Sequence, residues 1–228
     1  MSLVDVIIPA LNEEKALPRV LAEIPRPPVR RIIVADNGST DRTAAVAEEH
    51  GAEVVREPER GYGAACLRAL AQLAGDPPDI VVFLDGDYSD HPAELLSLID
   101  PIAAGHADMV IGSRVRGHSE RGALSPQQRV GNAIACTALR LFYGVHYTDL
   151  GPFRAVRWET LQELAMVDRN FGWTVEMQIK AAKRGVPYLE VPVSYRRRIG
   201  VSKVSGTCRG SLSAGATILW LLGRYAWS

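Results

Sequence analysis

Two aspartates follow an apolar run in the first half of the chain. Residues 80–84 are all apolar and lead directly into Asp85, Gly86 and Asp87. Such a run is typical of a buried strand of a parallel sheet, and ligands of these sheets bind just beyond the carboxyl ends of the strands. Two carboxylates at that place suit a hard divalent cation that also holds substrate phosphates. The alternative is an ordinary turn, because Asp and Gly are common turn residues.

Two more polar clusters follow apolar runs nearer the N-terminus. Residues 4–8 precede a segment with Pro9, Asn12 and Glu13, and residues 31–35 precede a segment that runs from Asp36 to Asp41. Each cluster by itself fits turn and helix-cap chemistry. Three acid-containing clusters at the ends of neighbouring parallel strands should meet in one crevice, which favours a binding site.

The elements that must position these clusters alternate along the first half of the chain. We predict strands at residues 4–8, 31–35, 53–56, 80–84 and 109–112, and helices at residues 13–24, 41–50, 62–74 and 93–104. Repeated units of this length indicate an α/β fold with a parallel sheet and helices on both faces. In the second half we predict helices at 126–143, 171–184 and 211–227, and strands at 153–156 and 188–193. No linker or repeat divides the chain, so residues 1–228 are predicted to form a single domain.

Composition places the chain among ordinary globular proteins. Its 228 residues are 47% hydrophobic and 23% charged, and its three cysteines stand far apart. An odd, scattered set of cysteines argues against a disulfide scaffold or a zinc site and fits a reducing compartment. We recognise no signal peptide and no apolar stretch of the roughly 18 residues that a membrane span needs. The expected location is therefore the cytoplasm.

The zero net charge conceals an asymmetry between the two halves. Residues 1–110 carry 9 Lys and Arg against 19 Asp and Glu, while residues 111–228 carry 17 against 7. A basic second half suits an anionic partner such as a phosphate-bearing substrate or an anionic membrane surface. Nucleic acid is not expected, because aromatic residues are few there and no nucleic-acid motif is present. The alternative is that the two halves simply attract each other.

The motifs together resemble family-2 glycosyltransferases of the GT-A fold. The resemblance rests on four segments in register over the first 115 residues: Pro9-x-x-Asn12-Glu13, the run from Asp36 to Asp41, the glycine-containing run from Arg60 to Ala65, and Asp85-Gly86-Asp87. It implies a single Rossmann-like GT-A domain with a mixed, mostly parallel sheet. Residues 1–115 would form the nucleotide-sugar half and residues 116–228 the acceptor half.

The resemblance also implies roles for individual residues. Asp36 would contact the nucleobase or ribose, and Asp85 would face the ribose and sugar. Asp87 would bind Mg²⁺ or Mn²⁺, which stabilises the charge of a nucleoside diphosphate leaving group. The other nucleotide-sugar contacts would come from Pro9, Asn12, Glu13, Gly61 and Gly63, the two glycines allowing the backbone to approach the nucleotide closely.

The second half is similar to dolichyl-phosphate mannosyltransferases and bacterial polyprenyl-phosphate glycosyltransferases. After Asp87 the chain departs from that group by one extra residue and by Asp90 where the group has Gln. If that Gln is a metal ligand, Asp90 or Ser89 must replace it here, and Asp90 is the candidate we name. The other matching segments are 112–114, 149–155 and the basic loop at 195–203. Together with Arg129, these segments supply a candidate acceptor-phosphate set of Arg114, Arg129, Arg197 or Arg198, and Lys203.

Glu176 occupies the region where many family-2 enzymes keep an acidic base. It would either deprotonate an acceptor hydroxyl or only orient Arg or Lys side chains, and a phosphate acceptor would need no base.

The leading hypothesis is an inverting hexosyltransferase that uses a donor of the GDP-mannose or UDP-glucose class and a polyprenyl or dolichyl phosphate acceptor. The alternatives are transfer to a sugar or other hydroxyl with Glu176 as base, and a nucleotide-sugar-binding module without turnover. Without a span, the protein would contact the membrane peripherally, at its inner face, through residues 211–227. The sequence does not set the oligomeric state.

Overall fold

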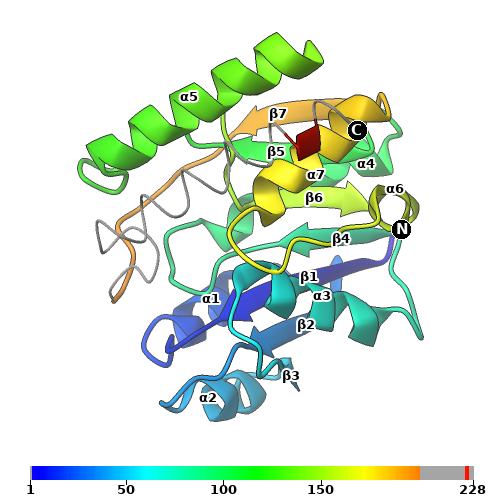
Figure 1. The fold of residues 1–228 in the computed structure, drawn as a ribbon. Helices are drawn as coiled ribbons and strands as arrows, with labels where there is room; N and C mark the ends of the chain where they lie inside the picture. The colour runs from blue at the N-terminus through cyan, green and yellow to red at the C-terminus, as the bar shows by residue number, and fades with distance from the viewer. Residues whose placement is uncertain (1, 201–223, 226–228) are drawn as a thin grey trace.

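A computed structural model shows one seven-stranded sheet between two layers of helices (Figure 1). The structure describes residues 2–200 and 224–225. The elements, in chain order, are β1 (Val4–Ala10), α1 (Leu17–Glu23), β2 (Val29–Asp36), α2 (Thr43–Glu49), β3 (Glu53–Arg56), α3 (Tyr62–Leu73), β4 (Ile80–Phe83), the short 3₁₀ helix η1 (Pro92–Glu94), α4 (Leu95–Ala103), β5 (Met109–Ser113), α5 (Pro126–Tyr143), β6 (Arg154–Arg157), α6 (Trp158–Leu164), α7 (Trp173–Lys183) and β7 (Tyr188–Pro192).

The strands lie in the order β3-β2-β1-β4-β6-β5-β7. β1 pairs in parallel with both β2 and β4, so the three strands that precede the polar clusters are neighbours and end at the same edge of the sheet. This confirms the predicted parallel arrangement. β6 pairs antiparallel with β4 and with β5, which makes the sheet mixed. Because β6 runs in the opposite direction, the segment before it lies at the edge where β4 and β5 end.

Both faces of the sheet are covered by apolar side chains. Successive residues of a strand point to opposite faces; accordingly Ile7 packs in one core with residues of α3, α5, α6 and α7, and Ile8 packs in the other with residues of α1, α2 and α4. Burial on both faces explains why β1 and β4 are almost continuously apolar.

Helix α5 begins and ends as its sequence indicates. Ser125 and Gln128 form a reciprocal capping box at its start, and Gly144 adopts the left-handed conformation just after its last residue. Helix α6, by contrast, lies in a stretch for which the sequence predicts no helix. The helix predicted at 211–227 lies outside the described residues except for 224 and 225, which are helical. Within the described part of the chain, no helix is long and apolar enough to cross a membrane.

Candidate active site

The loops after β1 and β2 are joined to each other by hydrogen bonds. The Asn12 carboxamide oxygen accepts from the Thr40 backbone N–H at 2.8 Å, and the Asn12 N–H donates to the Ser39 hydroxyl at 2.9 Å. The Glu13 N–H donates to the Thr43 hydroxyl at 2.8 Å. Asn12 has a φ of 54°, a left-handed conformation that Asn tolerates better than most residues. Its side chain therefore shapes the loop that presents Glu13.

At the end of β2, the adjacent residues Asp36 and Asn37 form different hydrogen bonds. Asp36 is buried and accepts from the Ser39 N–H at 3.0 Å, so its carboxylate closes the turn. The Asn37 carboxamide donates to the carbonyls of Glu57 and Glu59 and accepts from the Gly61 N–H. It thereby holds the segment before α3 against the end of β2.

A cavity of about 280 Å³ opens among these loops. Its walls come from the segments after β1, β2 and β4, the start of α3, and the loops around residues 171 and 198. The lining residues are Pro9, Ala10, Leu11, Glu13, Asn37, Arg60, Gly61, Tyr62, Ala65, Asp85, Gly86, Asp87, Phe171 and Arg198. The predicted donor residues Pro9, Glu13, Gly61, Asp85 and Asp87 are thus brought together, whereas Asn12, Asp36 and Gly63 stand outside the lining.

Sequence reasoning missed several residues of this cavity. Asn37 and Tyr62 lie inside two of the family motifs, immediately after Asp36 and Gly61, and their position in those motifs is the signal that could have found them. Phe171 is brought in by the loop before α7, more than a hundred residues away from those motifs, and no local pattern marks it.

Three aspartates converge at the end of β4. Asp85 accepts from the Tyr62 hydroxyl at 3.2 Å, and Asp87 accepts from the Ser89 N–H at 2.9 Å and the Ser89 hydroxyl at 2.5 Å. Asp90 is 1% exposed; its Oδ2 lies 3.5 Å from the Asp85 N–H, and its Oδ1 has no hydrogen-bond partner in the described part of the chain. A buried carboxylate oxygen without a partner is costly, which points to a missing positive ligand.

Burial and mutual repulsion perturb these acids. Desolvation raises the pKa of Asp85, and the neighbouring charge of Asp87 raises it further. The pKa of Asp90 lies well above its usual range because of desolvation and the charges of Asp85 and Asp87. Carboxyls perturbed in this way inside a cleft are typical of functional sites.

Arg198 places a guanidinium directly on this acidic cluster. Its Nη2 lies 2.7 Å from Asp87 Oδ2 and 3.7 Å from Glu13 Oε1, and its buried Nε has no partner among the described residues. A side-chain cation therefore sits where hard oxygen ligands converge. Taken with the partnerless oxygen of Asp90, this donor set fits a divalent cation. Among residues 2–200 and 224–225, no three His, Cys, Asp or Glu side chains are grouped closely enough to hold a metal ion by themselves.

The three arginines of the basic loop point to three different places. Arg196 forms an ion pair with Glu23 at 2.7 Å and stacks on the Tyr88 ring at 3.3 Å. Arg197 donates to the Arg121 carbonyl, and Arg198 reaches Asp87. The three positive charges are therefore separated, and each guanidinium group contacts protein oxygens, so the loop needs no bound anion to offset repulsion between them. Lys203 lies outside the described residues.

The two glycines of the motif before and within α3 make room for the protein's own chain. A Cβ on Gly61 would lie 2.0 Å from the Arg169 carbonyl oxygen, and one on Gly63 would lie 2.0 Å from that of Asp168. The Gly63 N–H donates to the Asn170 carbonyl at 3.1 Å. The family resemblance implied that these glycines let the backbone approach a nucleotide. In the structure, both glycines instead make room for the backbone of the loop at 168–170.

Glu176 is fully buried at the start of α7 and lies outside the cavity lining. It forms an ion pair with Lys180 at 2.7 Å and accepts from the N–H groups of Val167 and Asp168. The Tyr225 hydroxyl also donates to it, at 3.0 Å. Of the two roles considered for Glu176, this geometry favours orientation of neighbouring groups, because its oxygens already hold the loop that packs against Gly61 and Gly63.

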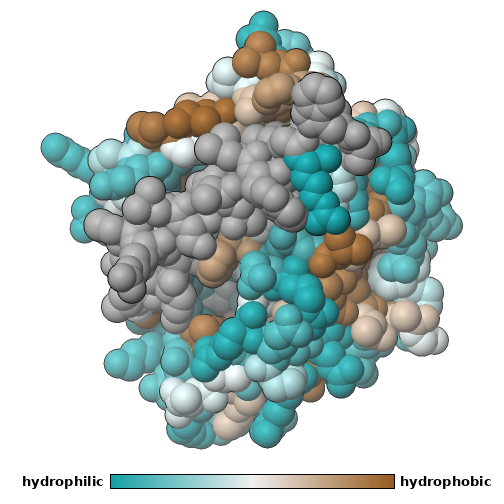
Figure 2. All heavy atoms as spheres, in the orientation of Figure 1, coloured by the Kyte–Doolittle hydropathy of each residue, from teal (hydrophilic) through white to brown (hydrophobic). Residues whose placement is uncertain are grey.

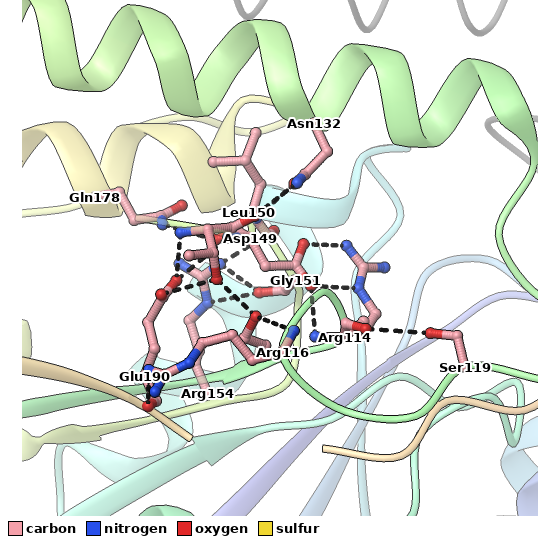
Figure 3. A network of polar contacts seen from close by, with 12 residues as sticks. Arg114, Arg116, Ser119, Asn132, Asp149, Leu150, Gly151, Arg154, Gln178 and Glu190 are labelled. Atoms are coloured by element: carbon pink, nitrogen blue, oxygen red, sulfur yellow. Dashed lines mark hydrogen bonds and ion pairs between the residues drawn. The ribbon is translucent and has the colours of Figure 1, made fainter. Parts of the chain in front are cut away.

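A second cavity, of about 520 Å³, lies at the same edge of the sheet beyond β5. Arg114 lines it and forms a bidentate pair with Asp149, at 2.8 and 2.7 Å (Figure 3). The charge of Asp149 offsets the burial of Arg114 and raises its pKa, so the guanidinium stays charged. Arg129 and Asn132 line the cavity from α5, and the Arg129 side chain makes no ion pair with the described residues. Of the predicted acceptor residues, Arg114 and Arg129 meet here, whereas Arg198 belongs to the first cavity.

The Arg114 pair is held by a network that spans several elements (Figure 3). Glu190 of β7 accepts from the Thr148 N–H and hydroxyl, and Gln178 of α7 donates to the Asp149 carbonyl. The Asn132 side chain donates to the Thr148 carbonyl and accepts from the Leu150 N–H. The segment before β6 is therefore fixed from three sides, and a fixed Asp149 gives Arg114 one orientation.

Comparison with known proteins gives consistent matches. Residues 5–165 match the model of glycosyl transferase family 2. An uncharacterized glycosyltransferase of Mycobacterium tuberculosis is 42% identical over 213 residues, which cover 92% of this chain and 94% of the relative. Polyprenol monophosphomannose synthase of Mycolicibacterium smegmatis is 34% identical over 220 residues, covering 89% and 81%. The crystal structure of glucosyl-3-phosphoglycerate synthase from Mycobacterium tuberculosis in complex with Mn²⁺, UDP-glucose and phosphoglyceric acid superposes with a TM-score of 0.74 at 27% identity, covering 97% of this chain and 80% of that one.

Proposed function

The chain belongs to glycosyl transferase family 2, and we propose that it is an inverting hexosyltransferase that moves a hexose from a nucleotide-diphospho-sugar to the phosphate of a polyprenyl phosphate. The observation that carries the proposal is the presence of two cavities at one edge of the sheet. The first contains the aspartates at the end of β4 together with Arg198, and the second contains Arg114 and Arg129 together with Asp149. This division suits a donor whose diphosphate binds with a cation and an acceptor whose phosphate binds to guanidinium groups.

The first cavity has features suited to a nucleotide sugar. Pro9, Leu11 and Phe171 supply apolar surface for a base, and Asn37 and Arg60 supply polar groups. Asp85, at the end of β4, would accept hydrogen bonds from ribose or sugar hydroxyls. Asp87, with Asp85 and Asp90 beside it, would hold the Mg²⁺ or Mn²⁺, which supplies positive charge to the diphosphate leaving group.

The Arg198 side chain is suited to contact the donor phosphates once a cation occupies the site beside Asp87. Its guanidinium forms ion pairs with Asp87 and Glu13. When a cation and donor bind, we infer that Arg198 leaves Asp87 and contacts the donor phosphates, where a planar guanidinium can bind two oxygens.

The transfer itself is a single displacement. An oxygen of the acceptor phosphate attacks the anomeric carbon as the bond from that carbon to the diphosphate oxygen breaks. The nucleoside diphosphate leaves with the electron pair, and the configuration at the anomeric carbon inverts. A phosphate monoester is already largely dianionic near pH 7, since its second pKa is about 6, so the step requires no general base. Arg114 and Arg129 would hold the acceptor phosphate.

A hydroxyl acceptor is the second candidate. It is favoured by the phosphoglyceric acid in the glucosyl-3-phosphoglycerate synthase complex, a ligand that carries both a phosphate and a hydroxyl. A hydroxyl would need a base, for which Glu176 was the sequence candidate. Its carboxylate is buried and shared with Lys180, Val167 and Asp168. That arrangement makes the phosphate acceptor the better supported of the two.

The test is a transfer assay with radiolabelled UDP-glucose and GDP-mannose, each offered with polyprenyl phosphate, polyprenol or 3-phosphoglyceric acid. We expect lipid-phosphate product with Mn²⁺ or Mg²⁺ and none after chelation by EDTA. Asp87→Asn should lower the rate by about 10²–10³-fold, whereas Asp100→Asn, at an exposed position on α4, should leave it unchanged. Transfer to polyprenol or to phosphoglyceric acid, with none to polyprenyl phosphate, would overturn the proposal.

A further inference from the structure

Helix α5 carries an apolar stripe on the side that faces solvent. Val130, Ile134 and Leu141 recur at a spacing of four and seven residues, which places them on one side of the helix. Their exposed fractions are 59%, 53% and 76%, and that of the adjacent Phe142 is 62%. In Figure 2 hydrophobic surface follows the upper edge of the molecule along the path that α5 takes in Figure 1.

The stripe does not attach α5 to the rest of the domain. The buried residues of the helix are Ala135, Cys136 and Leu139, and the last two pack into the core that α3 and α7 share. Two sides of α5 are therefore apolar, one toward the core and one toward solvent. Large exposed apolar side chains gathered along one helix mark an interaction surface.

The charges around the stripe distinguish between the partners that could cover it. Residues 126–143 contain Arg129 and Arg140 and no acidic residue, and the loop that precedes α5 adds the exposed Arg116 and Arg121 against one exposed acid, Glu120. A second copy of the chain seated stripe to stripe would set arginine against arginine. An anionic lipid surface offers acyl chains to the stripe and phosphates to the arginines, which is the pattern of interfacial helices.

We propose that α5 docks the protein on an anionic membrane, with Val130, Ile134, Leu141 and Phe142 inserted at the boundary of headgroups and acyl chains. This surface differs from the C-terminal segment in which the sequence suggested a membrane contact. The same helix lines the second cavity with Arg129 and Asn132. Docking therefore brings that cavity to the level of lipid phosphates, a consequence that rests on the proposed lipid-phosphate acceptor.

The experiment is flotation of the purified protein with vesicles. We compare vesicles of phosphatidylcholine with vesicles in which about one third of the lipid is anionic phosphatidylglycerol. The test variant is Ile134→Asp with Leu141→Asp, and the control is Leu96→Asp on α4, where the side chain is 41% exposed and lies apart from the stripe. All three positions are exposed, so the variants should fold, which thermal unfolding verifies.

We expect the wild type and the control to bind anionic vesicles, and the double variant to bind roughly tenfold more weakly. Equal binding of the double variant and the wild type would overturn the proposal. So would a wild-type dimer that the double variant abolishes in analytical ultracentrifugation without any change in vesicle binding, since a second copy would then be the partner.

A second assay separates this proposal from the proposed function. Transfer to a short-chain, water-soluble polyprenyl phosphate needs no membrane, so the double variant should retain the wild-type rate. If no form of the protein transfers sugar to that acceptor, the proposed function fails while the vesicle result still decides the docking surface.

Discussion

Replacing Arg198 by Gln should strengthen binding of Mn²⁺ in the absence of donor and weaken sugar transfer. The guanidinium lies 2.7 Å from Asp87 Oδ2, with side-chain exposures of 31% for Arg198 and 6% for Asp87. A divalent cation that binds Asp87 must first displace it. The Arg198→Gln substitution would remove both the competing contact and one positive charge beside the site, so the two effects on metal affinity have the same sign.

The magnitude follows from the degree of burial. At an effective dielectric constant of about 20, two unit charges in contact attract by roughly 4 kcal/mol, whereas exposed pairs contribute about 1 kcal/mol or less. Arg198 regains hydration when it leaves Asp87, which offsets much of the attraction. We therefore expect about 1.4 kcal/mol, which corresponds to a roughly tenfold lower dissociation constant for Mn²⁺.

The assay is titration of Mn²⁺ followed by the electron paramagnetic resonance signal of the free ion. Arg197→Gln is the matched control, because the Arg197 side chain donates to the Arg121 carbonyl and forms no ion pair with a described carboxylate. In the transfer assay Arg198→Gln should be slower by roughly 10²-fold, through loss of a phosphate contact. Unchanged or weaker Mn²⁺ binding by this variant would refute the idea that Arg198 and the cation compete for Asp87.

Three further predictions concern single positions. Asp87→Asn should abolish measurable Mn²⁺ binding in the same titration, and retained binding would move the metal site elsewhere. Gly63→Ala should lower the free energy of unfolding by about 1–3 kcal/mol, because its Cβ would lie 2.0 Å from the Asp168 carbonyl oxygen; urea denaturation measures this, and an unchanged midpoint would contradict the contact. Glu176→Ala should destabilise the fold by about 3–5 kcal/mol, since it leaves Lys180 buried without its partner. Glu176→Gln, measured per folded molecule, should retain most transfer activity, and a nearly inactive Gln variant would restore the base role.

The local parts of the fold could be read from the sequence because their causes are local. Ser125, Gln128 and Gly144 set the two ends of α5 through contacts within a few residues. The strands β1 and β4 are recognisable because burial on both faces leaves little room for polar side chains. Helix α6 was not predicted because seven residues are too few to show a clear helical repeat of apolar positions.

The partners of individual side chains could not be read in the same way. Asp36 and Asn37 are adjacent in one motif, yet one closes a turn and the other bridges to the segment before α3. Gly61 and Gly63 did signal a close approach, but the approaching chain is the loop at 168–170. Which groups meet across such distances depends on how the loops fold over one another, and no local pattern encodes that.

By itself, the sequence determined that acids follow three apolar runs typical of parallel strands and that a basic second half accompanies an acidic first half. These features depend on residue type and order alone, since parallel strands end at a common edge. Only the tertiary structure decided that Arg198 lies on Asp87, that Asp149 holds Arg114 at a second cavity, and that Glu176 is buried beneath the 167–170 loop. Each of these contacts joins residues far apart or sets the burial of a charge, and both depend on the packing of the whole chain.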